Sequence, residues 1–374
     1  MFELVSPCLF GLEGPLGDEL RHGGFSDVRP ENGRVRFKGT ADDVARANIT
    51  LRMAERVLIE VGAWSAATFD ELFEGTAALP WEDYIPKSGA FPVKGYSLNS
   101  ALYSVPDCQK IIKKAVSKRL GLKYGMEWLP EDDALYQIQF SIMKDQVSIC
   151  IDTSGAGLHK RGYRPRSVVA PLRETLAAAI VSLTRYRGRG DFTDPFCGTG
   201  TIPIEAALIA RNRAPGLKRG FSAEKFDFIG SARFAEARRT AAAAEFSGEY
   251  HIFASDIDPA AIELAQASAK LAGVDGDITF ETADARVFER TTERGILATN
   301  PPYGERLLEK REAGEIYSDF GRAMRELHGW SAYILSPHTD FERLYGREAD
   351  KKRKLYNGMI KCDLFIYRQG QASR

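Results

Sequence analysis

The chain has 374 residues, of which 51 are basic and 51 are acidic, so its formal net charge at pH 7 is zero. This length exceeds one ordinary hydrophobic core and predicts two or three domains. The balanced charge excludes nucleic-acid binding through bulk charge, so any nucleic-acid surface must come from local clusters of basic residues.

Cysteine spacing and hydropathy exclude further classes of protein. The five cysteines stand apart, with no Cys-x-x-Cys and no Cys/His pair at metal-ligand spacing, so we expect neither a metal site nor a disulfide framework. For Cys197 we expect the role of a small buried residue and not that of a nucleophile. No apolar run approaches the ~20 residues that cross a bilayer, and residues 1–20 carry acids where a secretory signal has basic residues. The sequence therefore predicts a cytoplasmic enzyme.

Residues 1–65 alternate short strands and helices. Apolar residues recur with period two in the strands and with a period near 3.6 in the helices. The predicted strands cover residues 2–7, 35–38 and 57–61 and include Val28, and the predicted helices cover residues 12–21 and 41–49. These elements indicate an α+β unit.

Residues 66–155 predict a second α+β unit. Its predicted elements are helices at residues 69–84 and 107–120 and strands at residues 91–97, 136–143 and 147–152. Gly121 is suited to end the second helix. Lys144 and Asp145 form the predicted turn between the last two strands.

One face of the helix predicted at residues 107–120 is basic. Lys110, Lys113, Lys114 and Lys118 lie at or near the spacing i, i+4 and i+8, which places them on one side of a helix. Such a row is suited to follow an RNA phosphate backbone. A solvated helix face has the same pattern, so the lysines alone leave both interpretations open.

A basic linker at residues 156–170 joins the two halves of the chain. It combines positive charge with the aromatic ring of Tyr163, which is a suitable contact for RNA. The candidate RNA-binding residues of the linker are His159, Lys160, Arg161, Arg164 and Arg166. His159 alone is no evidence for acid–base catalysis, because a solvated linker histidine gives the same signal. A helix-like run at residues 168–184 follows, with Pro171 near its start.

A glycine-rich turn separates a strand from a helix in the second half. Residues 191–201 read DFTDPFCGTGT and lead into a helical pattern. Gly198 and Gly200 let the backbone approach a ligand. A P-loop needs a Lys-Ser/Thr pair that is absent after the second glycine, and a dinucleotide fold needs a glycine where Pro203 stands. Both kinds of site are therefore disfavoured.

Two later strands end in acidic residues. Asp256 follows a predicted strand at residues 251–255, and its carboxylate can accept hydrogen bonds from both hydroxyls of a ribose. Asp258 is suited to cap the helix that follows. Asp284 follows a predicted strand at residues 278–282 and can accept a hydrogen bond from an adenine amino group. This order of glycine turn and acids is what an S-adenosylmethionine site needs.

The tetrapeptide Asn300-Pro301-Pro302-Tyr303 follows a predicted strand at residues 295–298. The Asn300 side-chain oxygen and the Pro301 carbonyl can each accept a hydrogen bond from one NH2 group, which directs the nitrogen lone pair toward an electrophile. Tyr303 offers a flat surface for stacking. A proline-rich turn after a strand is the alternative. Carbon-5 methylation of a pyrimidine is disfavoured, because it would require a cysteine in this loop.

The glycine turn, the two acids and the Asn-Pro-Pro-Tyr loop, in this order, resemble the class I S-adenosylmethionine-dependent methyltransferases that methylate amines. The resemblance implies a Rossmann-like α/β sheet with an antiparallel final hairpin, and S-adenosylmethionine as the cofactor. The cofactor-binding residues that it implies are Asp194, Pro195, Phe196, Gly198, Gly200, Thr201, Asp256, Ile257, Asp284, Ala285 and Asn300. The implied catalytic residues, which hold the target amine, are Asn300, Pro301, Pro302 and Tyr303.

The front half and the junction resemble a narrower family. Residues 75–152 look like a THUMP RNA-binding domain, and the region before them looks like the ferredoxin-like unit that commonly precedes it. The strings LHKRGYR and APLRETLAA resemble the junction of bacterial THUMP methyltransferases that modify guanosine N2 in 23S ribosomal RNA. In that family the helix after the junction closes over the cofactor, which adds Pro171, Leu172 and Glu174 to the implied cofactor-binding residues.

These resemblances imply the domain order and the reaction. The segments are a ferredoxin-like α+β unit at 1–65, a THUMP domain at 66–155, the basic linker at 156–170 and a class I methyltransferase domain at 171–374. We expect methyl transfer to the N2 amine of a guanosine in 23S ribosomal RNA, with RNA as the partner and no assigned general base. A guanosine N2 in transfer RNA or an adenine N6 presents the same chemistry. A non-catalytic RNA-binding ribosome-assembly factor is the alternative outside enzymes, and the intact glycines and acids argue against it.

Overall fold

The computed structural model describes residues 1–164, 172–303 and 307–368. The chain forms two compact units. Unit 1 is built mainly from the first half of the sequence and unit 2 mainly from the second half, and each unit also takes in a short segment from the other half. Unit 1 comprises Met1–Pro7, Gly17–Leu158 and Gly220–Thr240, and unit 2 comprises Cys8–Leu16, His159–Arg219 and Ala241–Arg374. The predicted site residues Arg166 and Pro171 lie outside the described residues.

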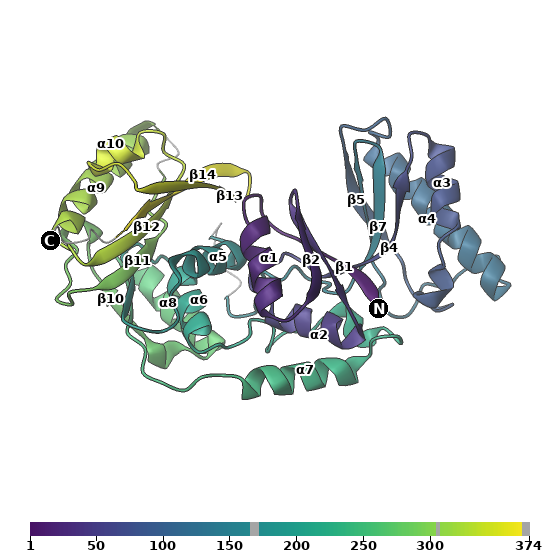
Figure 1. Cartoon of the computed structure of the whole chain (residues 1–374), viewed down its shortest axis with the longest axis horizontal. Coiled ribbons are helices and arrows are strands. Elements are labelled where there is room, and N and C mark those ends of the chain that lie inside the picture. Colours follow the sequence, from purple (N-terminus) through teal and green to yellow (C-terminus); the bar gives the residue numbers. More distant parts are fainter. Residues whose placement is uncertain (165–171, 304–306, 369–374) are drawn as a thin grey trace. The chain divides into compact units, whose positions relative to one another are not determined.

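Unit 1 contains a seven-stranded sheet in the order β2-β3-β1-β4-β7-β6-β5 (Figure 1). Its strands are β1 (Phe2–Pro7), β2 (Ser26–Glu31), β3 (Arg34–Gly39), β4 (Leu58–Ser65), β5 (Val93–Leu98), β6 (Ile138–Met143) and β7 (Gln146–Asp152). β4 pairs antiparallel with β1 on one side and with β7 on the other. The two α+β units predicted from the sequence therefore share one continuous sheet.

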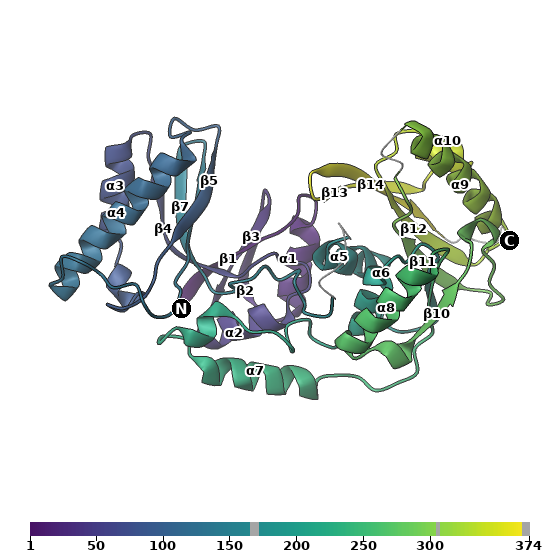
Figure 2. The ribbon, with the colours of Figure 1, turned by 180° about the vertical axis from the view of Figure 1, so that it is seen from behind.

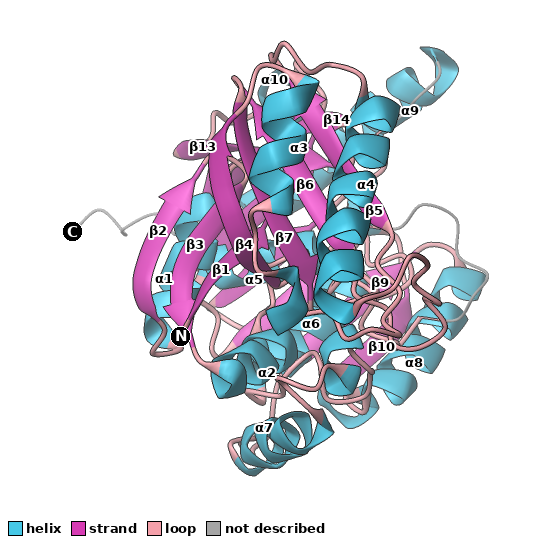
Figure 3. Cartoon of the chain, turned by 90° about the vertical axis from the view of Figure 1, so that its right-hand side faces the viewer, coloured by secondary structure: helices cyan, strands magenta, loops and turns pink. Residues whose placement is uncertain are grey.

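The apolar face of this sheet is covered by helices. Leu4, Phe37 and Ile59 lie side by side on neighbouring strands and are fully buried, as expected for one face of alternating strands. Figure 3 shows α3 (Phe69–Ala77) and α4 (Val105–Tyr124) over the part of the sheet that contains β4 to β7.

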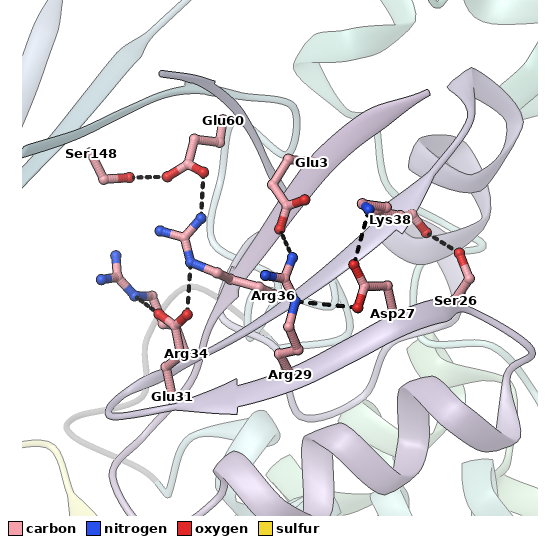
Figure 4. A network of polar contacts seen from close by, with 10 residues as sticks. All are labelled: Glu3, Ser26, Asp27, Arg29, Glu31, Arg34, Arg36, Lys38, Glu60 and Ser148. Atoms are coloured by element: carbon pink, nitrogen blue, oxygen red, sulfur yellow. Dashed lines mark hydrogen bonds and ion pairs between the residues drawn. The ribbon is translucent and has the colours of Figure 1, made fainter. Parts of the chain in front are cut away.

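The opposite face carries a ladder of paired charges (Figure 4). Arg36 contacts both Glu31 and Glu60, and Arg34 contacts Glu31 at 3.0 Å. The hydroxyl of Ser148 donates a hydrogen bond of 2.6 Å to Glu60. These arginines are already balanced by carboxylates, so this face offers little free positive charge to a nucleic acid.

Hydrogen-bonded caps fix the starts of two helices in unit 1. Thr40 and Thr68 form capping boxes at the first turns of α2 (Ala41–Thr50) and α3. The helix α1 (Glu13–His22) precedes them in the chain. The helices α1, α2 and α3 correspond to helices predicted from apolar periodicity, although α3 ends earlier than predicted.

Two predicted helix ends are corrected by the structure. The helix predicted at residues 69–84 ends at Ala77, because Pro80 cannot continue it, and a separate 3-10 turn follows at Trp81–Asp83. α4 continues through Gly121 to Tyr124 and ends where Gly125 takes a φ of +65°. The left-handed conformation that ends a helix is therefore at Gly125 and not at Gly121.

An insertion from the second half of the sequence completes unit 1. It contains the 3-10 helix η2 (Ser222–Lys225) and most of α7 (Ser231–Ala243). The ring of Phe226 is fully buried and stacks on Tyr136, with ring centroids 4.3 Å apart. Such a buried stacked pair stabilises the attachment of the insertion to unit 1.

Unit 2 contains a second seven-stranded sheet, in the order β10-β9-β8-β11-β12-β14-β13 (Figure 2). Its strands are β8 (Asp191–Asp194), β9 (Ile252–Asp256), β10 (Ile278–Thr282), β11 (Gly295–Thr299), β12 (Trp330–Ser336), β13 (Lys351–Asn357) and β14 (Ile360–Tyr367). The strands β8 to β12 are parallel, and β14 runs antiparallel to both of its neighbours. The predicted Rossmann-like sheet with an antiparallel final hairpin is confirmed.

Within the described residues, five α-helices accompany this sheet. They are α5 (Glu174–Thr184), α6 (Thr201–Ala210), α8 (Pro259–Ala272), α9 (Leu307–Arg325) and α10 (Phe341–Tyr345). Every residue of α6 is buried, and α6 packs against α5, α8 and β8. The helix that follows the glycine turn is thus held from several sides.

Among the described residues, no helix is both long and apolar enough to cross a membrane.

Candidate active site

The candidate cofactor and target residues lie at the carboxyl ends of neighbouring parallel strands in unit 2. β8 has β9 on one side and β11 on the other. Open α/β sheets bind ligands at such a point, where the strand order reverses. Asp194 ends β8, Asp256 ends β9 and Asn300 directly follows β11. The topology therefore brings together three motifs that are far apart in the sequence.

The glycine turn uses its two glycines differently. Both have a positive φ, +51° at Gly198 and +81° at Gly200. A Cβ atom at Gly200 would lie 3.0 Å from the Cβ of Ala265 on α8, so this glycine permits close helix packing. A Cβ atom at Gly198 would meet no atom within 4 Å. The space beside Gly198 fits a ligand that approaches the backbone, as the cofactor would.

Asp256 binds the glycine turn and keeps acceptor capacity for a ribose. Its Oδ2 atom accepts a hydrogen bond of 2.9 Å from the Gly198 amide, and its Oδ1 atom accepts one of 3.0 Å from the Asp258 amide. Each carboxylate oxygen keeps a further lone pair for a ribose hydroxyl. Asp258 caps α8 by accepting from the Ala260 amide at 2.9 Å, which is the capping role expected from the sequence.

The predicted adenine side combines an acid with exposed apolar residues. Asp284 accepts hydrogen bonds from the Arg286 amide at 2.9 Å and from its guanidinium at 2.8 Å, and the guanidinium lowers the pKa of Asp284. An adenine amino group would have to share these oxygens. Ile257 is 62% exposed and Val287 is 75% exposed. Val287 was not predicted from the sequence, although an apolar residue just after a strand-end acid was a usable signal.

Asp194 joins the glycine turn to the target loop. Its Oδ1 atom accepts a hydrogen bond of 2.5 Å from the Thr299 hydroxyl and one of 3.1 Å from the Phe196 amide. The side chain is buried, and burial raises the pKa of Asp194 to about 7. Thr299 was not predicted as a site residue. A direct contact between Asp194 and the cofactor stays a prediction.

The Asn-Pro-Pro-Tyr loop is held by a hydrogen bond between two of its own residues and by hydrogen bonds to side chains of β13 and α9. The Tyr303 hydroxyl donates to the Asn300 Oδ1 atom at 2.5 Å and accepts from the Asn357 side chain at 3.3 Å. The Tyr317 hydroxyl donates to the Pro302 carbonyl at 2.6 Å. In this arrangement one acceptor position of Asn300 is used by Tyr303, and the second lone pair stays available to an amine.

Two cysteines near the site are buried thiols. Burial raises the pKa of Cys197 far above its usual range and also raises the pKa of Cys362. The Cys362 sulfur lies 3.8 Å from the Tyr303 hydroxyl, a proximity that the sequence did not predict. Because the thiolate is the nucleophile, neither side chain is suited to covalent attack on a base.

The junction arginine Arg161 has a different role from the one predicted. Its side chain is 2% exposed and forms an ion pair of 3.3 Å with Glu205 of α6, whose side chain is fully buried. The Tyr163 hydroxyl donates to the same carboxylate at 3.2 Å. A buried, paired guanidinium presents no charge to an RNA phosphate, so the expected RNA contact of Arg161 is corrected to an internal ion pair.

Arg164 is likewise directed into unit 2. Its guanidinium pairs with Glu174 at 2.8 Å and donates to the Leu172 carbonyl and, at 2.9 Å, to the Thr201 hydroxyl. All three partners were predicted cofactor-side residues. Arg164 therefore connects the start of α5 with the start of α6, and its side chain is 18% exposed, so its expected RNA contact stays a prediction. Burial raises the pKa of Glu174.

The other predicted RNA-binding residues differ in exposure. Lys110, Lys114 and Lys118 are exposed along α4 in unit 1, as their spacing predicted. Lys113 is half-buried between Glu131, at 2.6 Å, and the ring of Phe91. Lys160 is exposed in unit 2, and His159 is half-buried. Their RNA contacts stay predictions.

Three segments of the chain match models of known domain families. Residues 3–58 match the RlmL ferredoxin-like domain, residues 66–152 match the THUMP domain, and residues 161–366 match the RMKL-like methyltransferase domain. The chain is 44% identical over 98% of its length to a Bacillus subtilis (strain 168) protein named "Putative RNA methyltransferase YpsC", 96% of which is covered.

Two further relatives add a longer protein and a solved structure. A Syntrophotalea carbinolica protein named "Ribosomal RNA large subunit methyltransferase K/L" is 34% identical over 96% of the chain, which spans only 52% of that relative. The solved structure "SMU.472, a putative methyltransferase complexed with SAH" is 39% identical with a TM-score of 0.93, and the match covers 99% of both chains.

The family model covers more than half of the chain, and YpsC matches it nearly end to end. The described site has a glycine turn open at Gly198, a strand-end acid bound to that turn and an asparagine that directly follows β11, the other neighbour of β8. The chain therefore belongs to the RMKL-like methyltransferase family, with RlmL ferredoxin-like and THUMP domains ahead of its S-adenosylmethionine-dependent methyltransferase domain.

Proposed function

We propose that the protein methylates the exocyclic N2 amine of a guanosine in large-subunit ribosomal RNA, in the cytoplasm. The observation that carries this proposal is the position of Asn300. The Asp194–Thr299 hydrogen bond of 2.5 Å fixes the target loop to the glycine turn, so an amine held by Asn300 would lie beside the cofactor position.

The chemistry of the target explains why an asparagine and a proline carbonyl suffice. The lone pair of a guanine N2 amine is delocalised into the ring, so the amine is a poor nucleophile until it is oriented. Bound S-adenosylmethionine supplies an activated methyl group. Asn300 and Pro301 each accept a hydrogen bond from the amine and turn its lone pair out of conjugation, and alignment of the reactants supplies much of the rate. The proton leaves after transfer, to water or a nearby carbonyl, and we assign no general base.

The choice of RNA as substrate rests on the front half of the chain. A THUMP domain precedes the catalytic domain, and Lys110, Lys114 and Lys118 are exposed on one helix in unit 1. An exposed row of lysines attracts a phosphate backbone without reading sequence. The name of the Syntrophotalea relative favours ribosomal RNA as the substrate class.

Nucleoside mass spectrometry tests both the base and the RNA. Ribosomal and transfer RNA are separated from cells with and without the gene and digested to nucleosides. We expect N2-methylguanosine to fall in the large-subunit RNA alone. Its loss from transfer RNA instead would reassign the substrate, and loss of N6-methyladenosine would reassign the base. Unchanged nucleosides in both pools would overturn the proposal.

A further inference from the structure

The turn of the β13–β14 hairpin exposes an apolar side chain. Asn357 and Ile360 are paired across the hairpin, and the turn between them consists of Gly358, with a φ of +64°, and Met359. Met359 is 97% exposed and Ile360 is 40% exposed. A methionine in this position contributes almost no buried area to folding, so packing within the chain does not account for it.

This turn lies next to the target loop of the same unit. The Asn357 side chain donates to the Tyr303 hydroxyl at 3.3 Å, and Tyr303 donates to Asn300 at 2.5 Å. Met359 is two residues beyond Asn357, so their Cα atoms are within about 7 Å. The turn is therefore adjacent in the chain to a residue that contacts the loop that would hold the target amine.

The surroundings of Met359 favour a nucleic acid as the contact. Five of the six charged residues of the β13–β14 hairpin are basic, namely Lys351, Lys352, Arg353, Lys354 and Lys361, and the sixth is Asp363, opposite Lys354. Two of them are engaged, because Lys352 pairs with Glu342 at 2.6 Å and Arg353 donates to the Gly11 carbonyl at 2.8 Å. Lys354 and Lys361 are exposed, so positive charge flanks the apolar turn.

An aromatic side chain also packs against a residue of β13. Phe10, from the N-terminal segment that belongs to unit 2, is 56% exposed and lies edge to face with Tyr356, with centroids 6.1 Å apart. The Phe10 segment is fixed in place, because a Cβ atom at Gly11 would lie 2.5 Å from the Lys354 carbonyl. Apolar and aromatic side chains bordered by lysines are the composition that binds unpaired or unstacked bases.

We propose that Met359 contacts the RNA beside the target guanosine and fills the gap left in the base stack when that guanosine turns into the site. The inference rests on the proposed function. Extruding a base costs a few kcal/mol of stacking and pairing, and apolar side chains inserted between bases offset such costs in other nucleic-acid-binding proteins. A thioether adapts to irregular surroundings better than a branched side chain.

Site-specific crosslinking tests the position of Met359. The full chain carrying p-benzoylphenylalanine at position 359 is mixed with large-subunit ribosomal RNA from cells lacking the gene and irradiated. We expect crosslinks within about three nucleotides of the guanosine that the wild-type protein methylates, since an inserted side chain reaches only adjacent steps. The same residue placed at position 246, where Phe246 is 60% exposed, is the matched control and should not mark that site. Crosslinks from position 359 elsewhere on the RNA would overturn the inference.

Kinetics provide a second test. Met359→Ala should lower kcat/KM for this RNA roughly tenfold, which corresponds to the loss of about 1.4 kcal/mol of contact with the neighbouring bases, with the dissociation constant for S-adenosylmethionine unchanged. Met359→Leu should restore most of the activity, and Phe246→Ala should leave it intact. Wild-type activity in Met359→Ala would contradict the proposed insertion. If the wild-type protein itself methylates no ribosomal RNA, the proposed function fails instead, so the two failures are distinguishable.

Discussion

The Tyr303 hydroxyl donates a hydrogen bond of 2.5 Å to the Asn300 side-chain oxygen. This contact orients the amide while its Oδ1 atom keeps a lone pair for the target amine. Asn357 donates to Tyr303 in turn at 3.3 Å. The amine acceptor is thus held in place by a chain of hydrogen bonds that ends on the β13–β14 hairpin.

Asn300→Ala removes the proposed amine acceptor. We expect kcat to fall by about 10² to 10³, as when one positioned hydrogen-bonding group is removed from other active sites. Calorimetry with S-adenosylmethionine should show a dissociation constant within a few-fold of the wild type. Asn32→Ala, at an exposed position of unit 1, serves as the control. Equal activity in the two variants would remove Asn300 from the mechanism.

Tyr303→Phe separates the two roles of the tyrosine. The variant keeps the ring but loses the hydroxyl that positions Asn300, so kcat should fall several-fold, in line with about 1 kcal/mol for a hydrogen bond. Tyr303→Ala also removes the stacking surface and should cost about tenfold more. Single-turnover measurements of methyl transfer check this order. Equal rates in the two variants would indicate that the ring itself contributes nothing.

Asp194 should make stability depend on pH. Burial raises its pKa in the folded protein to about 7 from an ordinary value of 3.8, so the folded state binds the proton more tightly than the unfolded state. Its contribution is fully present below pH 3.8 and is lost as the pH rises through about 7, at up to about 1.4 kcal/mol per pH unit. Calorimetry should show a melting temperature that declines between those values. Asp194→Asn should flatten this decline, and an unchanged slope would contradict the assignment.

Arg161→Ala should destabilise unit 2 without changing RNA affinity. It leaves Glu205 buried without its ion-pair partner, a change that costs about 3–5 kcal/mol in other proteins. The double variant Arg161→Met/Glu205→Leu should recover much of this loss, because no unpaired charge is left inside. Melting temperatures and RNA titrations check both parts. A large loss of RNA affinity in a well-folded Arg161→Ala protein would restore the RNA-binding interpretation.

The contribution of each lysine of α4 to RNA binding should depend on whether its side chain is exposed. Neutralising Lys110, Lys114 and Lys118 together should weaken RNA binding. The slope of log affinity against log salt should fall by about 0.7–0.9 for each phosphate that the variant no longer neutralises. Lys113→Met is the matched control, since its ammonium is held by Glu131. If the triple variant binds with the wild-type salt slope, this face of α4 is a solvated surface.

The sequence by itself determined the elements and the local motifs. Strands such as β1 and β10 were predicted to the residue, because short-range apolar alternation and turn residues decide where a strand begins and ends. The glycine turn, Asp256 and the Asn300 loop were found for the same reason, since each motif is contiguous. The helix ends at Ala77 and Gly125 were missed, because several nearby residues could end each helix.

Only the tertiary structure decided which charges are internal and which side chains meet. Arg161 and Lys160 are adjacent in a basic run, yet one is buried against Glu205 and the other is exposed. Thr299, Asn357 and Cys362 join the site through strand pairing, and β4 joins two predicted units into one sheet. Such contacts link residues far apart in the chain. Periodicity gives the direction of a side chain relative to its own element, but not the partner that the fold places opposite it.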